Sequence, residues 1–152
     1  YSAYDYICCP VGTGGTVAGI TIANNGRSKI IGFSALKGGE FLTKEIFNHI
    51  QTVTNDEEIT EELMNSFELN TEFHLGGYAK ITEELLNFVR NFYSQHQIKW
   101  DTIYNGKMAF GVFELIKANY FPKNSSILLV HTGGMQGIKG IEQRNKIKLY
   151  ED

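Results

Sequence analysis

Short apolar runs alternate with longer periodic segments in the first third of the chain. Residues 4–9 are rich in aromatic and β-compatible side chains and end at a proline and a glycine cluster, which is typical of a strand entering a loop. Apolar positions within residues 16–23 suit a buried helix that stops near Asn24. Residues 29–34 predict a second buried strand, and residues 40–53 follow the period of an amphipathic helix. The expected order is strand, helix, strand, helix.

The middle of the chain continues this alternation with weaker signals. Residues 54–62 are acidic and predict a surface helix or loop, whereas residues 67–73 alternate apolar and polar side chains as a short strand does. Thr82 can cap a following helix, because two glutamates come directly after it and suit the positive end of a helix dipole. We therefore expect a strand and then a capped helix in this part.

The last third holds a predicted loop at residues 101–107, a helix at 108–120 ended by Pro122, and an apolar strand at 126–131. The tail after these residues is polar. Strands and helices alternate through most of the chain. This order predicts an α/β fold with a mostly parallel sheet covered by helices.

Composition and charge narrow the classes of function. With 152 residues, 42% of them hydrophobic, the chain is long enough for one domain with a sizeable core. The net charge of −3, without a basic block, argues against nucleic acid or a membrane as partner, and a cytoplasmic location is expected. The adjacent Cys8 and Cys9 lie in an apolar run, which predicts buried strand residues rather than a disulfide or a metal site.

The most informative local segment is the glycine-rich loop of residues 11–16, between a predicted strand and a predicted helix. In such a loop the backbone N–H groups can converge on a phosphate, and the helix adds the positive end of its dipole. The spacing excludes two common nucleotide motifs. A dinucleotide fingerprint starting at Gly12 would need glycine where Val17 stands, and a nucleoside-triphosphate loop would need lysine where Ile20 stands. The alternatives are a plain turn, or Thr16 acting only as a helix N-cap.

Further segments join this loop to a known family. The loop and the following Ala18 and Gly19 resemble the cofactor-phosphate loop of fold-type II pyridoxal 5'-phosphate (PLP) enzymes, which share the tryptophan synthase β-like fold. Residues 101–107 (DTIYNGK) resemble a family segment that frames the active site, and residues 131–134 (HTGG) a strand end near the cofactor ring. Residues 76–78 fall where the family carries another tyrosine. Together they resemble the C-terminal half of the 1-aminocyclopropane-1-carboxylate deaminase and D-cysteine desulfhydrase family.

The resemblance implies a PLP-dependent reaction on a small amino acid that releases ammonia and a 2-keto acid. It also implies a homodimer. The implied catalytic residues are Tyr104 and Tyr78. The implied cofactor-binding residues are Gly12, Thr13, Gly14, Gly15, Thr16, Asn105 and Thr132.

The lysine that forms the Schiff base with PLP precedes the phosphate loop in this family, but the first lysine here is Lys29. Residues 1–152 are therefore expected to be a C-terminal portion, inactive without an N-terminal segment that carries this lysine.

The chain departs from the deaminase pattern at Asn105, where true deaminases carry glutamate. Thr132 resembles the neutral partner of the pyridine nitrogen in desulfhydrases, so expulsion of a thiolate is expected to be faster than opening of a cyclopropane. Lys107 is expected on the surface or in a structural salt bridge, and His131 is expected to be a structural histidine. Two other functions remain open: another fold-type II PLP lyase, or a phosphate-binding or regulatory module without catalysis.

Overall fold

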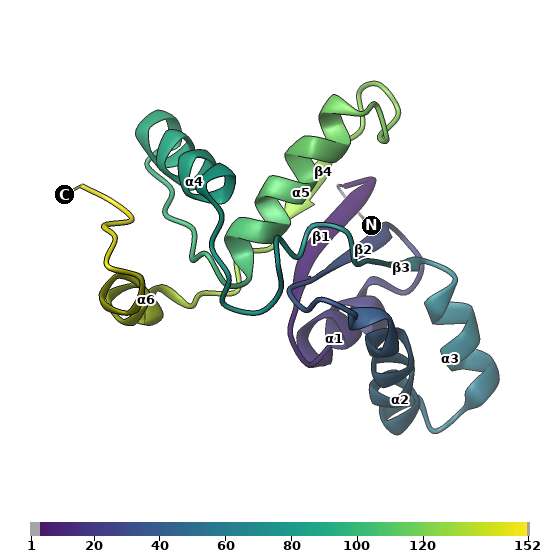
Figure 1. Ribbon diagram of the computed structural model, residues 1–152. Coiled ribbons are helices and arrows are strands. Elements are labelled where there is room, and N and C mark those ends of the chain that lie inside the picture. Colours follow the sequence, from purple (N-terminus) through teal and green to yellow (C-terminus); the bar gives the residue numbers. More distant parts are fainter. Residues whose placement is uncertain (1–3, 152) are drawn as a thin grey trace.

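A computed structural model describes residues 4–151 and shows a parallel sheet with helices on both faces (Figure 1). Within these residues the sheet has four strands in the order β3-β2-β1-β4. Their bounds are β1 Tyr6–Val11, β2 Lys29–Ser34, β3 Phe67–Asn70 and β4 Ile127–Leu129. The predicted α/β fold with a mostly parallel sheet is confirmed.

The central strand β1 has a different neighbour on each side. It pairs with β2 from Tyr6 opposite Lys29 to Val11 opposite Ser34, and with the shorter β4 up to Cys8 opposite Leu129. Successive strand residues point to opposite faces. The two cysteines accordingly enter different core clusters, and both are fully buried as predicted.

One face of the sheet is covered by α1 (Gly15–Asn24), α2 (Leu42–Thr54) and α3 (Glu57–Met64), with the short 3₁₀ helix η1 (Gly39–Phe41) leading into α2. Figure 1 shows these helices on the same side of the strands. The core on this side is mostly aliphatic. Its helical members are Val17, Ala18, Leu42, Ile46, Ile50 and Leu63.

The other face is covered by α5 (Asn105–Lys117), against which α4 (Glu83–His96) packs. This second core is richer in aromatic side chains, and Phe88 and Phe110 meet edge to face with ring centroids 5.6 Å apart. The 3₁₀ helix η2 (Met135–Gly137) leads into α6 (Ile138–Asn145). In Figure 1, α6 lies on the opposite side of the molecule from α2 and α3.

One predicted element is wrong in part and others need different bounds. Residues 101–107 are not all loop, because α5 already begins at Asn105. The first strand, predicted at residues 4–9, is Tyr6–Val11, and the polar tail, for which no element was predicted, contains α6. The strands predicted at 67–73 and 126–131 keep only Phe67–Asn70 and Ile127–Leu129. The predicted N-cap is confirmed, since the Leu85 N–H donates to the Thr82 hydroxyl at 3.2 Å.

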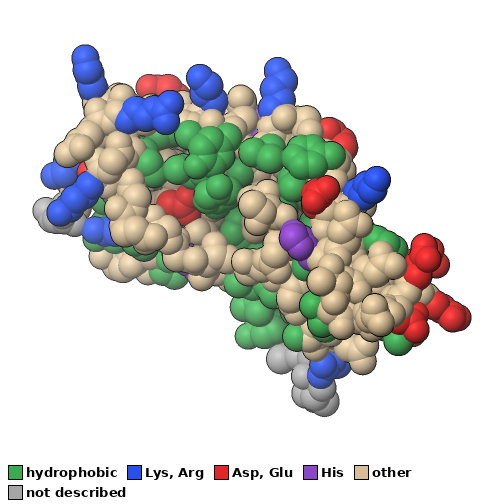
Figure 2. Space-filling view, turned by 90° about the horizontal axis from the view of Figure 1, so that it is seen from below, with side chains coloured by type: hydrophobic (Ala, Val, Ile, Leu, Met, Phe, Trp, Pro, Cys, Tyr) green, Lys and Arg blue, Asp and Glu red, His purple; other side chains and the backbone are tan. Residues whose placement is uncertain are grey.

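Acidic and basic side chains share the surface, with one concentration of acidic groups. On the face shown in Figure 2, several acidic side chains gather at one end, while other Asp and Glu side chains lie among the Lys and Arg side chains of the rest. The helix α3, whose sequence holds four glutamates, lies at the acidic end. None of the helices in residues 4–151 is both long and apolar enough to cross a bilayer.

Candidate functional site

The strand order creates a crevice between the loops that follow β1 and β4. The chain passes from β1 to β2 and β3 on one side and returns to β4 on the other side of β1. In parallel sheets, ligands bind outside the carboxyl ends of the strands at such a switch point. A cavity of about 300 Å³ lies here. It is lined by Pro10, Gly12, Thr13, Gly14, Gly15, Thr16, Val17, Tyr104 and Thr132.

The loop after β1 offers this cavity a series of free hydrogen-bond donors. Within residues 4–151, the backbone N–H groups from Gly12 to Val17 donate to no other residue. The hydroxyl groups of Thr13 and Thr16 also have no partner in this part of the chain, and both residues are exposed. The first N–H groups of a helix have no acceptor within the helix and carry the positive end of its dipole. The loop can therefore accept an anion.

Glycine is required at two positions of this loop. Gly14 has φ 92°, and a Cβ there would lie 2.6 Å from Cγ1 of Ile46. A Cβ on Gly12 would lie 3.1 Å from Cε1 of Tyr104. Gly14 is the N-cap residue of α1 and the helix begins at Gly15, so Thr16 is not the N-cap. Its hydroxyl remains available to a ligand.

Asp101 organises the start of α5. Its carboxylate accepts the backbone N–H groups of Ile103 at 2.9 Å, Tyr104 at 2.8 Å and Asn105 at 3.0 Å. The side-chain amide of Asn105 donates to the same carboxylate at 2.6 Å. Bonds to a buried carboxylate are stronger than bonds between neutral groups. Asp101 thus fixes the helix end from which Tyr104 reaches the cavity.

Asn105 connects this helix end to the segment after β4. Its amide nitrogen donates to the Gly133 carbonyl at 3.0 Å in addition to Asp101. Its amide oxygen accepts the backbone N–H of Thr132 at 2.9 Å and the Thr132 hydroxyl at 3.1 Å. Both donors and both acceptor positions of the carboxamide are thereby used. Asn105 holds Thr132 in place from behind the cavity, and a direct contact with a cofactor stays a prediction.

Tyr104 and Tyr78 lie next to each other although they are 26 positions apart in the sequence. Their ring centroids are 5.9 Å apart with the planes at 61°. Burial raises the pKa of the Tyr104 hydroxyl, and neighbouring Tyr78 and Asp101 raise it further. Tyr104 therefore keeps its proton at neutral pH and can donate it. Tyr78 is 54% exposed and does not line the cavity itself.

Lys107 lies neither on the surface nor in a salt bridge, so that prediction is wrong. Its side chain is buried, and its Nζ donates to the backbone carbonyls of His74 at 2.7 Å and Gly77 at 2.6 Å. Burial lowers the pKa of its ammonium to about 8, although Asp101 raises it in part. The sequence offered one signal for this placement. Lys107 is three and four residues before Phe110 and Gly111, which pack in the core, so it shares their helix face.

His131 is a structural histidine, as predicted. Its ring stacks on Trp100 with centroids 5.0 Å apart. Its Nδ1 accepts the Gly133 N–H at 3.1 Å, and its Nε2 lies 3.0 Å from the Lys99 carbonyl oxygen. These partners assign the neutral tautomer with the proton on Nε2. His131 thus helps to fix the turn after β4.

The structure therefore brings most of the predicted site residues together. The glycine loop, Tyr104 and Thr132 line one cavity, Tyr78 lies beside Tyr104, and Asn105 lies behind Thr132. Sequence reasoning underestimated Asp101, which accepts the Tyr104 N–H, and Lys107, which donates to the carbonyls of His74 and Gly77. Residues 4–151 contain no cluster of three or more His, Cys, Asp or Glu that could hold a metal ion.

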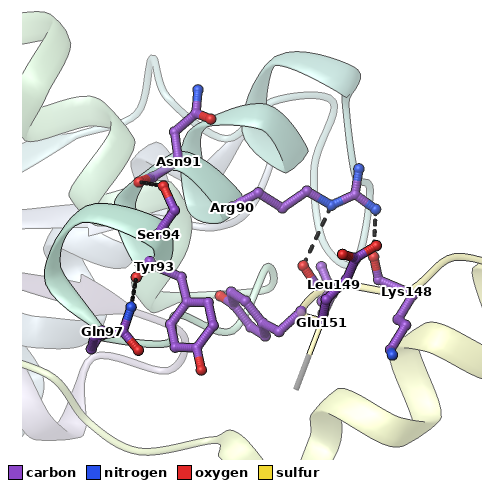
Figure 3. A pocket seen from close by; sticks show the side chains of 9 residues that line it. Arg90, Asn91, Tyr93, Ser94, Gln97, Lys148, Leu149 and Glu151 are labelled. Carbon is purple, nitrogen blue, oxygen red and sulfur yellow. Dashed lines mark hydrogen bonds between the residues drawn. The ribbon is translucent and has the colours of Figure 1, made fainter.

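A larger cavity of about 790 Å³ lies elsewhere, between α4 and the chain after α6 (Figure 3). Two cations line it, and one of them, Arg90, already donates to the backbone carbonyls of Lys148 and Leu149. Figure 3 shows these bonds, with Tyr93 and Gln97 along the same wall. No residue of the predicted site lines this cavity. The smaller cavity at the sheet edge is therefore the candidate site.

Comparisons with known proteins agree with this geometry. No protein-family model matches the chain. A 1-aminocyclopropane-1-carboxylate deaminase of Cyberlindnera saturnus is 33% identical over 131 residues, which cover 84% of this chain and 38% of that protein. A protein of the same name from Rhizobium rhizogenes (strain K84) is 28% identical over 141 residues, 90% of this chain and 42% of that protein.

A crystal structure of an ACC deaminase homologue has the same fold. It matches with a TM-score of 0.68 and 24% sequence identity, over 92% of this chain and 44% of that chain. The chain thus spans about two fifths of the length of the relatives that it matches. Sequence and fold agree over most of its residues, and the chain is homologous to a part of the 1-aminocyclopropane-1-carboxylate deaminases, whose homologue of known structure has the same fold.

Proposed function

We propose that this chain supplies the phosphate-binding and ring-edge part of a PLP-dependent deaminase that acts on a small amino acid. The observation that carries the proposal is the loop after β1, whose free N–H groups and two free hydroxyls face a cavity at the switch point of the sheet. The similarity to the named deaminases supports the same proposed function.

The cavity fits a phosphate ester in its donors and its shape. The loop from Gly12 to Val17 offers backbone donors, and a Cβ on Gly15 would meet nothing within 4 Å, so the loop is open to a ligand there. Thr13 and Thr16 add neutral donors. No lysine or arginine lines the cavity within the described residues. The phosphate would therefore be held by oriented dipoles rather than by a cation.

At the other end of the cavity, Thr132 would lie near the pyridine nitrogen. Its hydroxyl donates to the Asn105 amide oxygen, which leaves oxygen lone pairs for another donor. When bound, PLP supplies an electron sink for negative charge that develops next to the amino group of the substrate. Tyr104, which keeps its proton at neutral pH, would donate a hydrogen bond or a proton to the substrate, with Tyr78 beside it.

The remaining parts of the reaction lie outside this chain in our proposal. Because the chain spans about two fifths of its relatives, we propose that another part of the protein supplies the lysine that binds PLP covalently. For the substrate we favour D-cysteine or a β-substituted alanine over the cyclopropane. Asn105 and Thr132 are neutral, and a thiolate needs less help to leave than a ring carbon. A kcat/KM ratio of the full-length protein that favours the cyclopropane would contradict this choice.

Affinity for PLP tests the phosphate site. Thr16→Val in the full-length protein should weaken PLP binding by roughly 10- to 100-fold, because a hydrogen bond to a charged group is worth about 1.5–3 kcal/mol. Thr43→Val is the matched control, since Thr43 is an exposed threonine in the first turn of α2, as Thr16 is in that of α1. Equal PLP affinity in both variants, measured by equilibrium dialysis, would place the phosphate elsewhere. The same outcome is expected if the chain is a regulatory module that binds another ligand.

A further inference from the structure

The segment that carries Tyr78 has an unusual backbone. Leu75, Gly76, Gly77 and Ala79 all have positive φ, at 49°, 92°, 107° and 56°. For the two residues that are not glycine this conformation is strained, and it persists only when the surroundings enforce it. Tyr78 lies inside this segment and is more than half exposed. Its position therefore depends on what holds the backbone around it.

Two consecutive turns form the segment, and each closes on one carbonyl oxygen. The Gly77 N–H donates to the His74 carbonyl at 3.0 Å, and the Lys80 N–H donates to the Gly77 carbonyl at 3.2 Å. Lys107 donates to these same two oxygens, at 2.7 and 2.6 Å. One ammonium group therefore joins both turns to helix α5. Gly76 adds a local bond, from its N–H to Nδ1 of His74 at 3.1 Å.

The burial of the Lys107 ammonium is energetically unfavourable. Its side chain is 1% exposed, and none of the residues 4–151 places a carboxylate within salt-bridge distance of it. Removing an ammonium from water is unfavourable, and an apolar side chain of similar length would fill the same volume. Stability alone does not explain a lysine here. What the ammonium provides is two directional bonds to a strained turn.

We propose that Lys107 is a positioning residue that fixes Tyr78 against Tyr104. Both contacts come from the start of α5: Tyr104 is its N-cap residue, and Lys107 follows one turn later. A single rigid helix end thus carries one tyrosine and holds the turn of the other, with the rings 5.9 Å apart. The inference rests on the proposed function, in which this tyrosine pair faces the substrate.

Lys107→Met in the full-length protein tests the proposal. We expect kcat/KM for D-cysteine to fall by at least 10-fold while PLP affinity changes less than 3-fold, because the phosphate loop is not touched. Lys107→Arg should not restore activity fully, since a planar guanidinium cannot reproduce the geometry of a compact ammonium that donates to two carbonyl oxygens. Lys117→Met is the matched control on the same helix. Lys117 is exposed and, among residues 4–151, pairs only with Glu114, so its loss should leave kcat/KM within 2-fold.

A double-mutant cycle with Tyr78→Phe separates positioning from general destabilisation. If Lys107 acts through Tyr78, the fold decrease in kcat/KM of the double variant will be smaller than the product of the fold decreases of the two single variants. A decrease in the double variant equal to the product of the two single decreases would overturn the proposal. A kcat/KM equal to that of the wild type in Lys107→Met would also overturn it.

Hydrogen exchange gives a readout that does not need turnover. Lys107→Met should speed exchange of the Gly77 and Lys80 amides at least 10-fold and leave β1 and β2 unchanged. Unchanged exchange at both amides would overturn the proposal. If the wild-type protein released no ammonia and bound no PLP, the proposed function would fail, whereas these exchange rates would still decide whether Lys107 holds the turn of Tyr78.

Discussion

Truncation of Asn105 to alanine removes the side chain that joins α5 to the end of β4. Four hydrogen bonds are lost, to Asp101, to the Gly133 carbonyl, and to the backbone N–H and hydroxyl of Thr132. The groups of Thr132 and Gly133 are near enough to the surface to find water, but the Asp101 carboxylate is buried. A bond to a charged group is worth about 1.5–3 kcal/mol and a neutral one about 1 kcal/mol. We therefore expect a loss of about 2–4 kcal/mol in the free energy of unfolding.

Urea unfolding followed by circular dichroism measures this loss. Asn91→Ala is the control, because Asn91 is exposed on α4 and its side chain makes no hydrogen bond within the described residues. The control should change stability by less than about 0.5 kcal/mol. In thermal unfolding, the loss at Asn105 corresponds to a midpoint lower by roughly 6–12 °C for a domain of this size. A loss below about 1 kcal/mol would show that Asn105 does not hold the two segments together.

The remaining predictions concern the glycine loop and the buried thiols. Gly14→Ala should lower the free energy of unfolding by about 2 kcal/mol, because the φ of Gly14 is positive and a Cβ there would meet Ile46. Gly15→Ala should leave it nearly unchanged in the same assay, because a Cβ there meets nothing within 4 Å. Burial raises the pKa of both Cys8 and Cys9 from 9.0 to about 12. Their contribution to stability is complete below pH 9 and is lost as the pH rises from 9 to 12, because the unfolded chain releases these protons first. A variant with alanine at both cysteines should lose less stability between pH 8 and pH 10.5, and an equal loss would count against the buried thiols as the cause.

The first helix and second strand could be predicted to within about a residue, and the first strand to within two, because their signals are local. An apolar run ends in a glycine cluster, and the C-cap residue of α1, Asn25, has the left-handed conformation that asparagine tolerates. The structure places the glycine loop and the HTGG segment at one edge of the sheet, where Thr132 and the loop line one cavity. Parallel strands present their carboxyl ends on the same side, so a common edge follows from the fold class, whereas the pairing of β4 with β1 that makes the two loops neighbours does not.

The start of α5 could not be found from local pattern because a residue outside the helix stabilises it. Asp101 accepts three backbone N–H groups from four positions before the first helical residue, whereas the usual cap directly precedes the helix. The helix α6 could not be predicted from the sequence for a different reason. Only Ile141 within it is buried, so its sequence shows almost no apolar stripe.

Lys107 shows the limit of reasoning from residue type. Lysine is rarely buried without a carboxylate partner, so a surface or ion-pair position was the reasonable expectation. Its actual partners are carbonyl oxygens of His74 and Gly77, which lie about 30 residues earlier in the chain. Side-chain chemistry does not encode a contact of this kind, because the acceptors belong to the backbone. Only the helix face shared with Phe110 pointed to burial.

The central claim is that the loop after β1 binds the phosphate of PLP. A crystal structure of the full-length protein with PLP tests it most directly. We predict phosphate oxygens within 3.2 Å, the usual hydrogen-bond limit, of backbone nitrogens between Gly12 and Val17 and of at least one hydroxyl of Thr13 or Thr16. PLP bound with its phosphate outside this loop, while these N–H groups face only solvent, would contradict the account.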